Sequence, residues 1–282
     1  MTGLDRRQAE LVQAWFPGAR LVADMSWGLV DSTVLHLATV DEEIVAKAGG
    51  PRNAHIARDI TAHETVVPRL AARGFAPRLL RADRDARILV HSYVPGDLVD
   101  DGPSESDPDV IQEAGEILSL LHSLGGYVDD TIEAQLISAG LKWLRKPTRI
   151  PAAQSALAQD YLAGHRPRPV WVVPSHGDYS GRNWVRTESG IAVIDFGRFG
   201  YRPRRQDFLR MFFRRWHDHP AERELFLAGY GEEAEADGVD WWIDVLREAV
   251  STAGWAHKVG DEPFERLGLR YVEIALDALG SP

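Results

Sequence analysis

The first third of the chain contains short apolar runs between turn residues, a pattern that is typical of β-strands. Such runs predict strands at residues 20–25, 34–40, 43–48, 76–80 and 87–94. Two other segments have the wider spacing of a helix. They predict a leading helix over residues 8–16 and a second helix over residues 55–73, with Pro68 as a kink or boundary inside it. The first third is therefore expected to be strand-rich.

Beyond residue 96 the apolar residues recur every three or four positions, which is typical of amphipathic helices. An acidic stretch rich in Ser and Pro, residues 97–109, is predicted to be the linker into this part. Helices are predicted at residues 110–124, 131–144 and 152–163, and through much of the chain from Phe208 onward. Two short apolar runs, residues 170–174 and 191–194, predict strands that lie between these helices in the sequence. The pattern as a whole predicts an α+β chain.

Composition excludes several classes of protein. The chain has 282 residues, enough for one large domain or two lobes. It has no cysteine, which leaves no disulfide framework or thiolate metal site and suits a reducing, cytoplasmic location. No apolar run approaches the ~18–20 residues of a membrane span, and the polar start of the chain does not resemble a signal peptide. The net charge of −10 disfavours nucleic acid as a partner and is compatible with a cationic small substrate.

The strongest chemical signal is a set of three polar residues around the strand predicted at 191–194. Asp178 lies in a loop, Asn183 follows five residues later, and Asp195 comes twelve residues after that, at the end of the apolar run. Mg²⁺ takes one or two protein oxygens and completes its coordination with waters and phosphates. Asn183 and Asp195 could supply those oxygens, which leaves Asp178 to accept the proton of an attacking hydroxyl. The spacing thus indicates phosphoryl transfer from Mg-ATP.

The loop reads His-Gly-Asp at residues 176–178, where protein kinases have His-Arg-Asp, and it is followed by Ile-Asp-Phe-Gly at 194–197. This combination resembles the aminoglycoside phosphotransferase and choline kinase branch of the kinase-like fold, in particular its antibiotic phosphotransferases. The resemblance implies a bilobal protein-kinase-like α+β fold. Residues 1–96 would form a small β-rich nucleotide-binding lobe with the hinge. Residues 97–282 would form a larger helical lobe with the catalytic loop and the acceptor site.

The resemblance also implies roles for residues of the first lobe. Lys47 would reach the α- and β-phosphates of ATP and pair with Glu64, whereas Arg58, Asp59 and His63 are expected on a solvated face. Main-chain groups of the hinge would bind adenine, at Ser92, Tyr93 and Val94. Gly28 and Ser32 would lie in the loop over the phosphates, although this loop is poor in glycine.

Further residues are assigned supporting roles by the same resemblance. His176 would support the catalytic loop, Asp207 would accept hydrogen bonds from its backbone, and His122 is expected to be a buried structural histidine. A basic cluster departs from the family pattern and could neutralise phosphate or pair with the acidic C-terminal region. Its members are Arg198, Arg202, Arg204 and Arg205.

An acidic stretch in the helical part suggests the kind of acceptor. It contains six acids and no Lys or Arg, namely Glu232, Glu233, Glu235, Asp237, Asp240 and Asp244. Carboxylates near a cleft would attract ammonium groups. We therefore expect a monomeric or homodimeric kinase that uses ATP and Mg²⁺ to phosphorylate a hydroxyl of an aminoglycoside or another basic antibiotic, including a basic cyclic peptide. Glu232, Glu233 and Glu235 are its candidate acceptor-binding residues.

Other functions stay open at this point. The acceptor could be an amino-alcohol or a sugar, since choline kinases share the motif. The glycine-poor phosphate loop would also suit a catalytically silent nucleotide-binding regulator, although the presence of Lys47, Asp178, Asn183 and Asp195 argues against silence. A metal-dependent hydrolase with His176 and Asp178 as ligands is less well supported, because no other His/Asp cluster has matching spacing.

Overall fold

The computed structural model describes residues 3–26, 31–100, 102–231 and 238–280. Gly28 and the acids Glu232, Glu233 and Glu235 lie outside these residues. Contacts between Cα atoms divide the chain into two compact units. One unit comprises Met1–Leu124, His176–Gly200 and Ala228–Gly231, and the other comprises Gly125–Ser175, Tyr201–Leu227 and Glu232–Pro282. The division into lobes at residue 96 stays a prediction.

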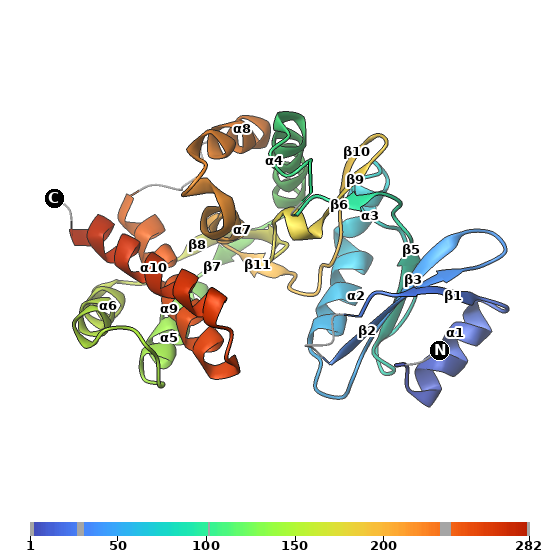
Figure 1. Cartoon of the computed structure of the whole chain (residues 1–282), viewed down its shortest axis with the longest axis horizontal. Helices are drawn as coiled ribbons and strands as arrows, with labels where there is room; N and C mark the ends of the chain where they lie inside the picture. The colour runs from blue at the N-terminus through green and yellow to red at the C-terminus, as the bar shows by residue number, and fades with distance from the viewer. Residues whose placement is uncertain (1–2, 27–30, 101, 232–237, 281–282) are drawn as a thin grey trace. The chain divides into compact units, whose positions relative to one another are not determined.

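The first unit is built on a five-stranded antiparallel sheet of order β1-β2-β3-β5-β4 (Figure 1). Its strands are β1 (Arg20–Asp24), β2 (Ser32–Ala38), β3 (Glu43–Gly49), β4 (Leu79–Asp83) and β5 (Ile88–Ser92). Helix α1 (Arg6–Trp15) precedes the sheet, and α2 (His55–Thr65) and α3 (Val67–Ala71) follow β3. A strand overlaps each of the five predicted ones, but the one predicted at residues 76–80 is shifted to Leu79–Asp83. The helix predicted over residues 55–73 is two helices, because Pro68 lies in the first turn of α3.

The two faces of this sheet carry separate hydrophobic clusters. Val12 of α1 packs with Leu35, Ile44 and Val90, whereas Ile56 and Ile60 of α2 pack with Leu89. Successive residues of a strand point to opposite faces, so neighbours such as Leu89 and Val90 belong to different clusters. Lys47 is the cross-strand partner of Leu89. Lys47 therefore projects from the face that α2 covers.

The rest of the first unit surrounds the loop after residue 175. Strands β6 (Asp97–Leu98), β9 (Trp184–Thr187) and β10 (Gly190–Val193) form a three-stranded sheet of order β10-β9-β6. Helix α4 (Pro108–Ser123) packs against β10. His122 of α4 is buried, and its Nδ1 lies 2.9 Å from the hydroxyl of Tyr230, so the prediction of a buried structural histidine is confirmed. The predicted linker, residues 97–109, instead begins with β6 and ends inside α4.

The second unit is mainly helical. Its described helices are α5 (Ile132–Leu144), α6 (Ala152–Gly164), α7 (Arg205–Met211), the short π-helix η2 (Phe212–Trp216), α8 (Pro220–Tyr230), α9 (Gly238–Val259) and α10 (Glu262–Gly280). The last three residues of α8 belong to the first unit. A small sheet of order β11-β8-β7 accompanies them, from β7 (Tyr127–Asp129), β8 (Val170–Ser175) and β11 (Gly200–Arg202). Helices α9 and α10 pack on each other. No helix in the described part of the chain is both long and apolar enough to cross a membrane.

Candidate active site

The loop after β8 holds Asp178 through its backbone on both sides. The backbone N–H of Asp178 donates to Nδ1 of His176 at 3.3 Å, and its carbonyl oxygen accepts the side-chain amide of Asn183 at 2.8 Å. Both flanking side chains are buried. A short 3₁₀ turn, η1 (Gly181–Asn183), brings Asn183 back toward Asp178. The predicted motif residues therefore form one hydrogen-bonded loop.

His176 also connects this loop to the segment that carries Asp195. Its Nε2 lies 3.0 Å from the carbonyl oxygen of Ile194. Because a carbonyl oxygen only accepts, Nε2 is the ring nitrogen that donates, and Nδ1 can accept from Asp178. The backbone N–H of Ile194 in turn donates to the carbonyl oxygen of Asn183 at 2.9 Å. These bonds place His176 between the catalytic loop and the Asp195 segment, and its expected role in supporting the loop stays a prediction.

Asp195, two residues after the end of β10, adopts an unusual backbone conformation. Its φ angle is 61°, in the left-handed region that residues other than glycine rarely adopt. Its Oδ1 accepts hydrogen bonds from Lys47 at 2.6 Å and from the backbone N–H of Gly197 at 3.2 Å. The ion pair with Lys47 holds the pKa of Asp195 well below its usual range, although burial opposes this. The side chain is 48% exposed, so the carboxylate can still meet a ligand.

The donor set of Asn183 and Asp195 fits a magnesium ion. The amide nitrogen of Asn183 is used by Asp178, which leaves the amide oxygen for a metal, and Oδ2 of Asp195 has no hydrogen bond among the described residues. The described residues contain no group of three or more His, Cys, Asp or Glu side chains suited to a metal. Mg²⁺ bound with a nucleotide does not require such a group, because phosphates and waters supply most of its ligands.

Lys47 is buried between two carboxylates. Its Nζ lies 2.6 Å from Oδ2 of Asp59 and 2.6 Å from Oδ1 of Asp195. Burial alone would lower the pKa of Lys47, but the two negative charges outweigh it and raise the pKa above its ordinary value. The lysine is therefore held as a cation beside Asp195.

The prediction that Glu64 pairs with Lys47 is wrong. Glu64 is exposed and pairs with Arg84 at 2.5 Å, while Asp59 occupies the place beside the lysine. The expectation of a solvated face is also wrong for Asp59 and His63, which are 1% and 2% exposed. Arg58 is partly buried and donates from Nε to the carbonyl oxygen of Gly197 at 3.0 Å. This face of α2 thus contacts both Lys47 and the Asp195 segment.

We expect Lys47→Ala to weaken ATP binding. Asp59→Ala should have the same effect, because it removes the carboxylate that fixes the ammonium group of Lys47. The apparent KM for ATP should rise about tenfold, the scale of losing a buried charged hydrogen bond. Glu64→Ala is the matched control, an acid of the same helix that pairs elsewhere, and it should leave the KM within about twofold. Steady-state kinetics at varied ATP measure all three. An effect of Glu64→Ala as large as that of Asp59→Ala would contradict this assignment.

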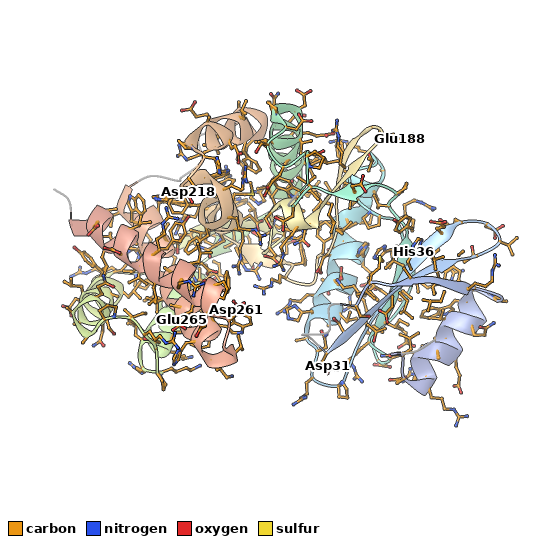
Figure 2. The ribbon with its side chains drawn as sticks, in the orientation of Figure 1. Asp31, His36, Glu188, Asp218, Asp261 and Glu265 are labelled. Carbon is orange, nitrogen blue, oxygen red and sulfur yellow. The ribbon has the colours of Figure 1, made fainter. Side chains whose placement is uncertain are left out.

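The hinge residues differ in the backbone groups that they can offer to a nucleotide. The N–H of Ser92 donates to Arg78 and the N–H of Tyr93 to Glu43, each at 2.9 Å. The N–H of Val94 has no acceptor among the described residues, which makes it the hinge donor best suited to adenine. The ring of Tyr93 stacks at 3.9 Å on His36, which projects from β2 and is labelled in Figure 2.

The remaining predicted residues lie in different surroundings. Ser32 begins β2, and Asp207 is fully buried in the first turn of α7. The proposed bond from Asp207 to the catalytic loop stays a prediction. Within the basic cluster, Arg205 is buried and pairs with Asp244 and, at 2.9 Å, with Glu133. For Arg205, pairing with the acidic C-terminal region is therefore the correct alternative.

The described part of the acidic stretch is paired with arginines. Glu232, Glu233 and Glu235 lie outside the described residues. Of the two described acids, Asp240 pairs with Arg168 and Asp244 with Arg205. These carboxylates are neutralised by arginines within their own unit. Residue spacing alone did not indicate these two pairs, because Arg168 and Arg205 lie 72 and 39 residues away, although Arg247, three residues after Asp244, also approaches it at 3.4 Å.

One residue beside Asp178 was missed. Arg182 places Nη2 at 2.7 Å from Oδ2 of Asp178, and Nε of Arg198 lies 3.9 Å from the same oxygen. Arg182 occupies the fourth position after Asp178, to which the motif assigns no chemical role. The carboxylate therefore faces two cations.

Comparison with known proteins identifies the family and the fold. A model of the phosphotransferase enzyme family matches residues 28–242. No curated protein matches the chain significantly. Among solved structures, a ternary complex of an aminoglycoside phosphotransferase APH(4)-Ia mutant with ADP and hygromycin B is similar with a TM-score of 0.72 and 14% identity, covering 98% of this chain and 99% of that one.

Two further solved structures have the same fold. A choline/ethanolamine kinase family protein from Mesorhizobium loti has a TM-score of 0.68 and 19% identity, covering 99% of this chain and 95% of that one. The GDP complex of aminoglycoside 2'-phosphotransferase-IIIa has a TM-score of 0.66 and 13% identity, covering 96% and 98%. At these identities the likeness concerns the fold, and it confirms the predicted kinase-like α+β architecture.

Proposed function

Because the chain belongs to the phosphotransferase enzyme family, we propose that it transfers the γ-phosphoryl group of ATP to a hydroxyl of a small cationic molecule. Family membership and the kinase-like fold make it a small-molecule phosphotransferase. The nucleotide, the metal and the acceptor are the proposed part. The observation that carries the proposal is the catalytic loop, in which His176 and Asn183 fix the backbone of Asp178 beside the Asp195 segment.

In the proposed mechanism each residue has a separate task. Asp178 aligns the acceptor hydroxyl and takes its proton late, since a loose phosphoryl-transfer transition state needs little activation of the nucleophile. Lys47 holds the α- and β-phosphates. Asn183 and Asp195 would hold Mg²⁺, which supplies positive charge where the phosphate oxygens gain negative charge. The buried pairing of Lys47 with Asp59 supports its task, because it fixes the direction of a flexible side chain.

The proposed acceptor is an aminoglycoside or another basic antibiotic. The net charge of −10 and the acids Glu232, Glu233 and Glu235 favour a molecule with ammonium groups. The pairing of Asp240 and Asp244 with arginines reduces this support to the first part of the stretch. An amino-alcohol is the second candidate, because the similar structures include a choline kinase, LicA from Streptococcus pneumoniae.

A panel of acceptors tests the proposal, with ADP release and product mass as readouts. It should contain hygromycin B, other aminoglycosides, a basic cyclic peptide antibiotic, choline, ethanolamine and a neutral sugar. We expect the best acceptor to carry at least two ammonium groups and its KM to rise with salt, because the Debye length shrinks from about 10 Å at 0.1 M to about 3 Å at 1 M. A neutral best acceptor would contradict the cationic-antibiotic proposal. If no acceptor of the panel supports ADP release, the kinase proposal is left without its substrate class.

Removing the acidic charges separates a binding role from a general field effect. Glu232→Gln, Glu233→Gln and Glu235→Gln together should raise the acceptor KM and leave the KM for ATP nearly unchanged. A matched control neutralises three exposed acids of the first unit, Glu10, Asp41 and Asp85. If the control raises the acceptor KM equally, only the net charge matters.

A further inference from the structure

The side chain of Asp178 is fixed by a residue at a position to which the motif assigns no role. His176 and Asn183 hold the backbone of Asp178. The carboxylate itself is held by Arg182, whose Nη2 donates to Oδ2 at 2.7 Å. Rotation about the side-chain bonds of Asp178 is therefore restrained by a different residue from those that restrain its backbone.

The local fold explains why Arg182 reaches this carboxylate. The backbone N–H of Asn183 donates to the carbonyl oxygen of Ser180 at 2.8 Å, which closes the 3₁₀ turn of η1. This turn reverses the chain, so the residue four positions after Asp178 returns to it. Arg182 is 32% exposed at its side chain, whereas the side chain of Asp178 is 10% exposed. The pair is thus shielded on the aspartate side, where water screens the attraction less.

We propose that Arg182 is a positioning residue for phosphoryl transfer, which sets the rotation of the Asp178 carboxylate so that it meets the acceptor hydroxyl in one fixed direction. The proposal rests on the proposed function of Asp178. Arg182 is well suited to this task, because a guanidinium group is planar, always charged and forms strong charge-assisted hydrogen bonds. An arginine beside a carboxylate weakens it as a base, but phosphoryl transfer depends more on alignment than on base strength.

Arg198 has a weaker form of the same relationship. Its Nε lies 3.9 Å from Oδ2 of Asp178, beyond hydrogen-bonding distance, and its side chain is 46% exposed. It adds positive charge near the carboxylate without fixing its direction. The two arginines therefore separate the effect of geometry from the effect of charge.

Kinetics of Arg182 variants test the positioning role. Arg182→Gln should lower kcat about 10–100-fold, the range expected from misplacing a catalytic group, with the KM for ATP within about twofold of wild type. Arg182→Lys keeps the charge but loses the planar fork, and it should restore kcat only in part. Arg198→Gln should cost less than Arg182→Gln. Arg7→Gln is the matched control, since Arg7 pairs with Asp83 from the helix on the opposite face of the sheet and should leave kcat unchanged.

A double-mutant cycle asks whether Arg182 acts through Asp178. In an Asp178→Asn background, Arg182→Gln should lower the remaining kcat by less than about threefold, because the group that it positions is already lost. The assay uses the best acceptor of the panel and, in parallel, hydrolysis of radiolabelled Mg-ATP with water as the acceptor. If the two changes multiply instead, Arg182 does not act through Asp178 and the proposal is overturned.

The pair can also be tested without any turnover. In urea unfolding of the same four proteins, the midpoint shifts of Arg182→Gln and Asp178→Asn should not add, because each change removes the same ion pair. If the midpoint shifts are coupled but the wild-type protein transfers no phosphoryl group, the ion pair is upheld and the function proposed for the chain is overturned. Additive midpoints, or an Arg182→Gln enzyme with normal kcat, would overturn the positioning role and leave the kinase proposal intact.

Discussion

Asp178→Asn is expected to lower phosphoryl transfer by about 10²-fold or more, the scale of losing a general base. The replacement has nearly the same shape, and the bonds that place this residue in the loop involve its backbone N–H and carbonyl oxygen. The loop should therefore keep its conformation. The amide cannot take the proton of the acceptor hydroxyl, and it loses the charge that pairs with Arg182.

Binding and turnover separate the possible outcomes of this experiment. Calorimetry with Mg²⁺ and a non-hydrolysable ATP analogue should give an affinity within about threefold of wild type, because Asp178 holds no nucleotide atom in the proposed mechanism. Asp85→Asn, at an exposed position of the same unit, is the matched control. A folded Asp178→Asn protein with near-normal kcat would remove Asp178 from the catalytic role.

The catalytic loop was predictable from sequence because its chemistry is local. Asp178 and Asn183 lie five residues apart, and their spacing sets the bond from the Asn183 side chain to the Asp178 backbone. The strand before Asp195 was visible as an apolar run. The antiparallel strands of the first unit were visible for a similar reason, as short apolar runs between turn residues, because helices cover both faces of the sheet.

The partner of Lys47 was harder to predict, because the choice depends on which face of α2 meets the sheet. Asp59 and Glu64 are five residues apart and point in different directions from a helix. The signal that would have identified Asp59 is its place on the stripe of Ile56, Ile60 and His63, which have the i, i+3, i+4, i+7 spacing of a buried face. A charged residue on such a stripe requires a buried partner, and Lys47 is that partner.

Other features could not be predicted because they depend on pairings that are distant in sequence. Strands β6, β7 and β11 have only two or three residues, too few for a periodic pattern. The stretch of six acids gave no indication that Asp244 is buried, since its partner Arg205 lies 39 residues away in the chain. Acids in a sequence therefore indicate a binding surface only after such internal pairs are excluded.

Asp195 should show the largest combined defect, because one carboxylate has three tasks. It pairs with Lys47, accepts the N–H of Gly197, and in the proposed mechanism holds Mg²⁺. Asp195→Ala also places alanine at a φ of 61°, which costs about 1–2 kcal/mol of backbone strain. Asp195→Asn is the cleaner change, since asparagine tolerates the left-handed region and can still accept from Gly197.

We expect Asp195→Asn to lower turnover by at least about 10²-fold, since a metal contributes several kcal/mol of charge stabilisation in the transition state. The distinguishing measurement is the affinity for a non-hydrolysable ATP analogue, taken with Mg²⁺ and again with a chelator. Wild type should bind more tightly with Mg²⁺, and Asp195→Asn should lose most of this difference, whereas Asp59→Ala should weaken binding under both conditions because it acts through Lys47. A Mg²⁺ dependence in Asp195→Asn equal to that of wild type would assign the metal to other oxygens.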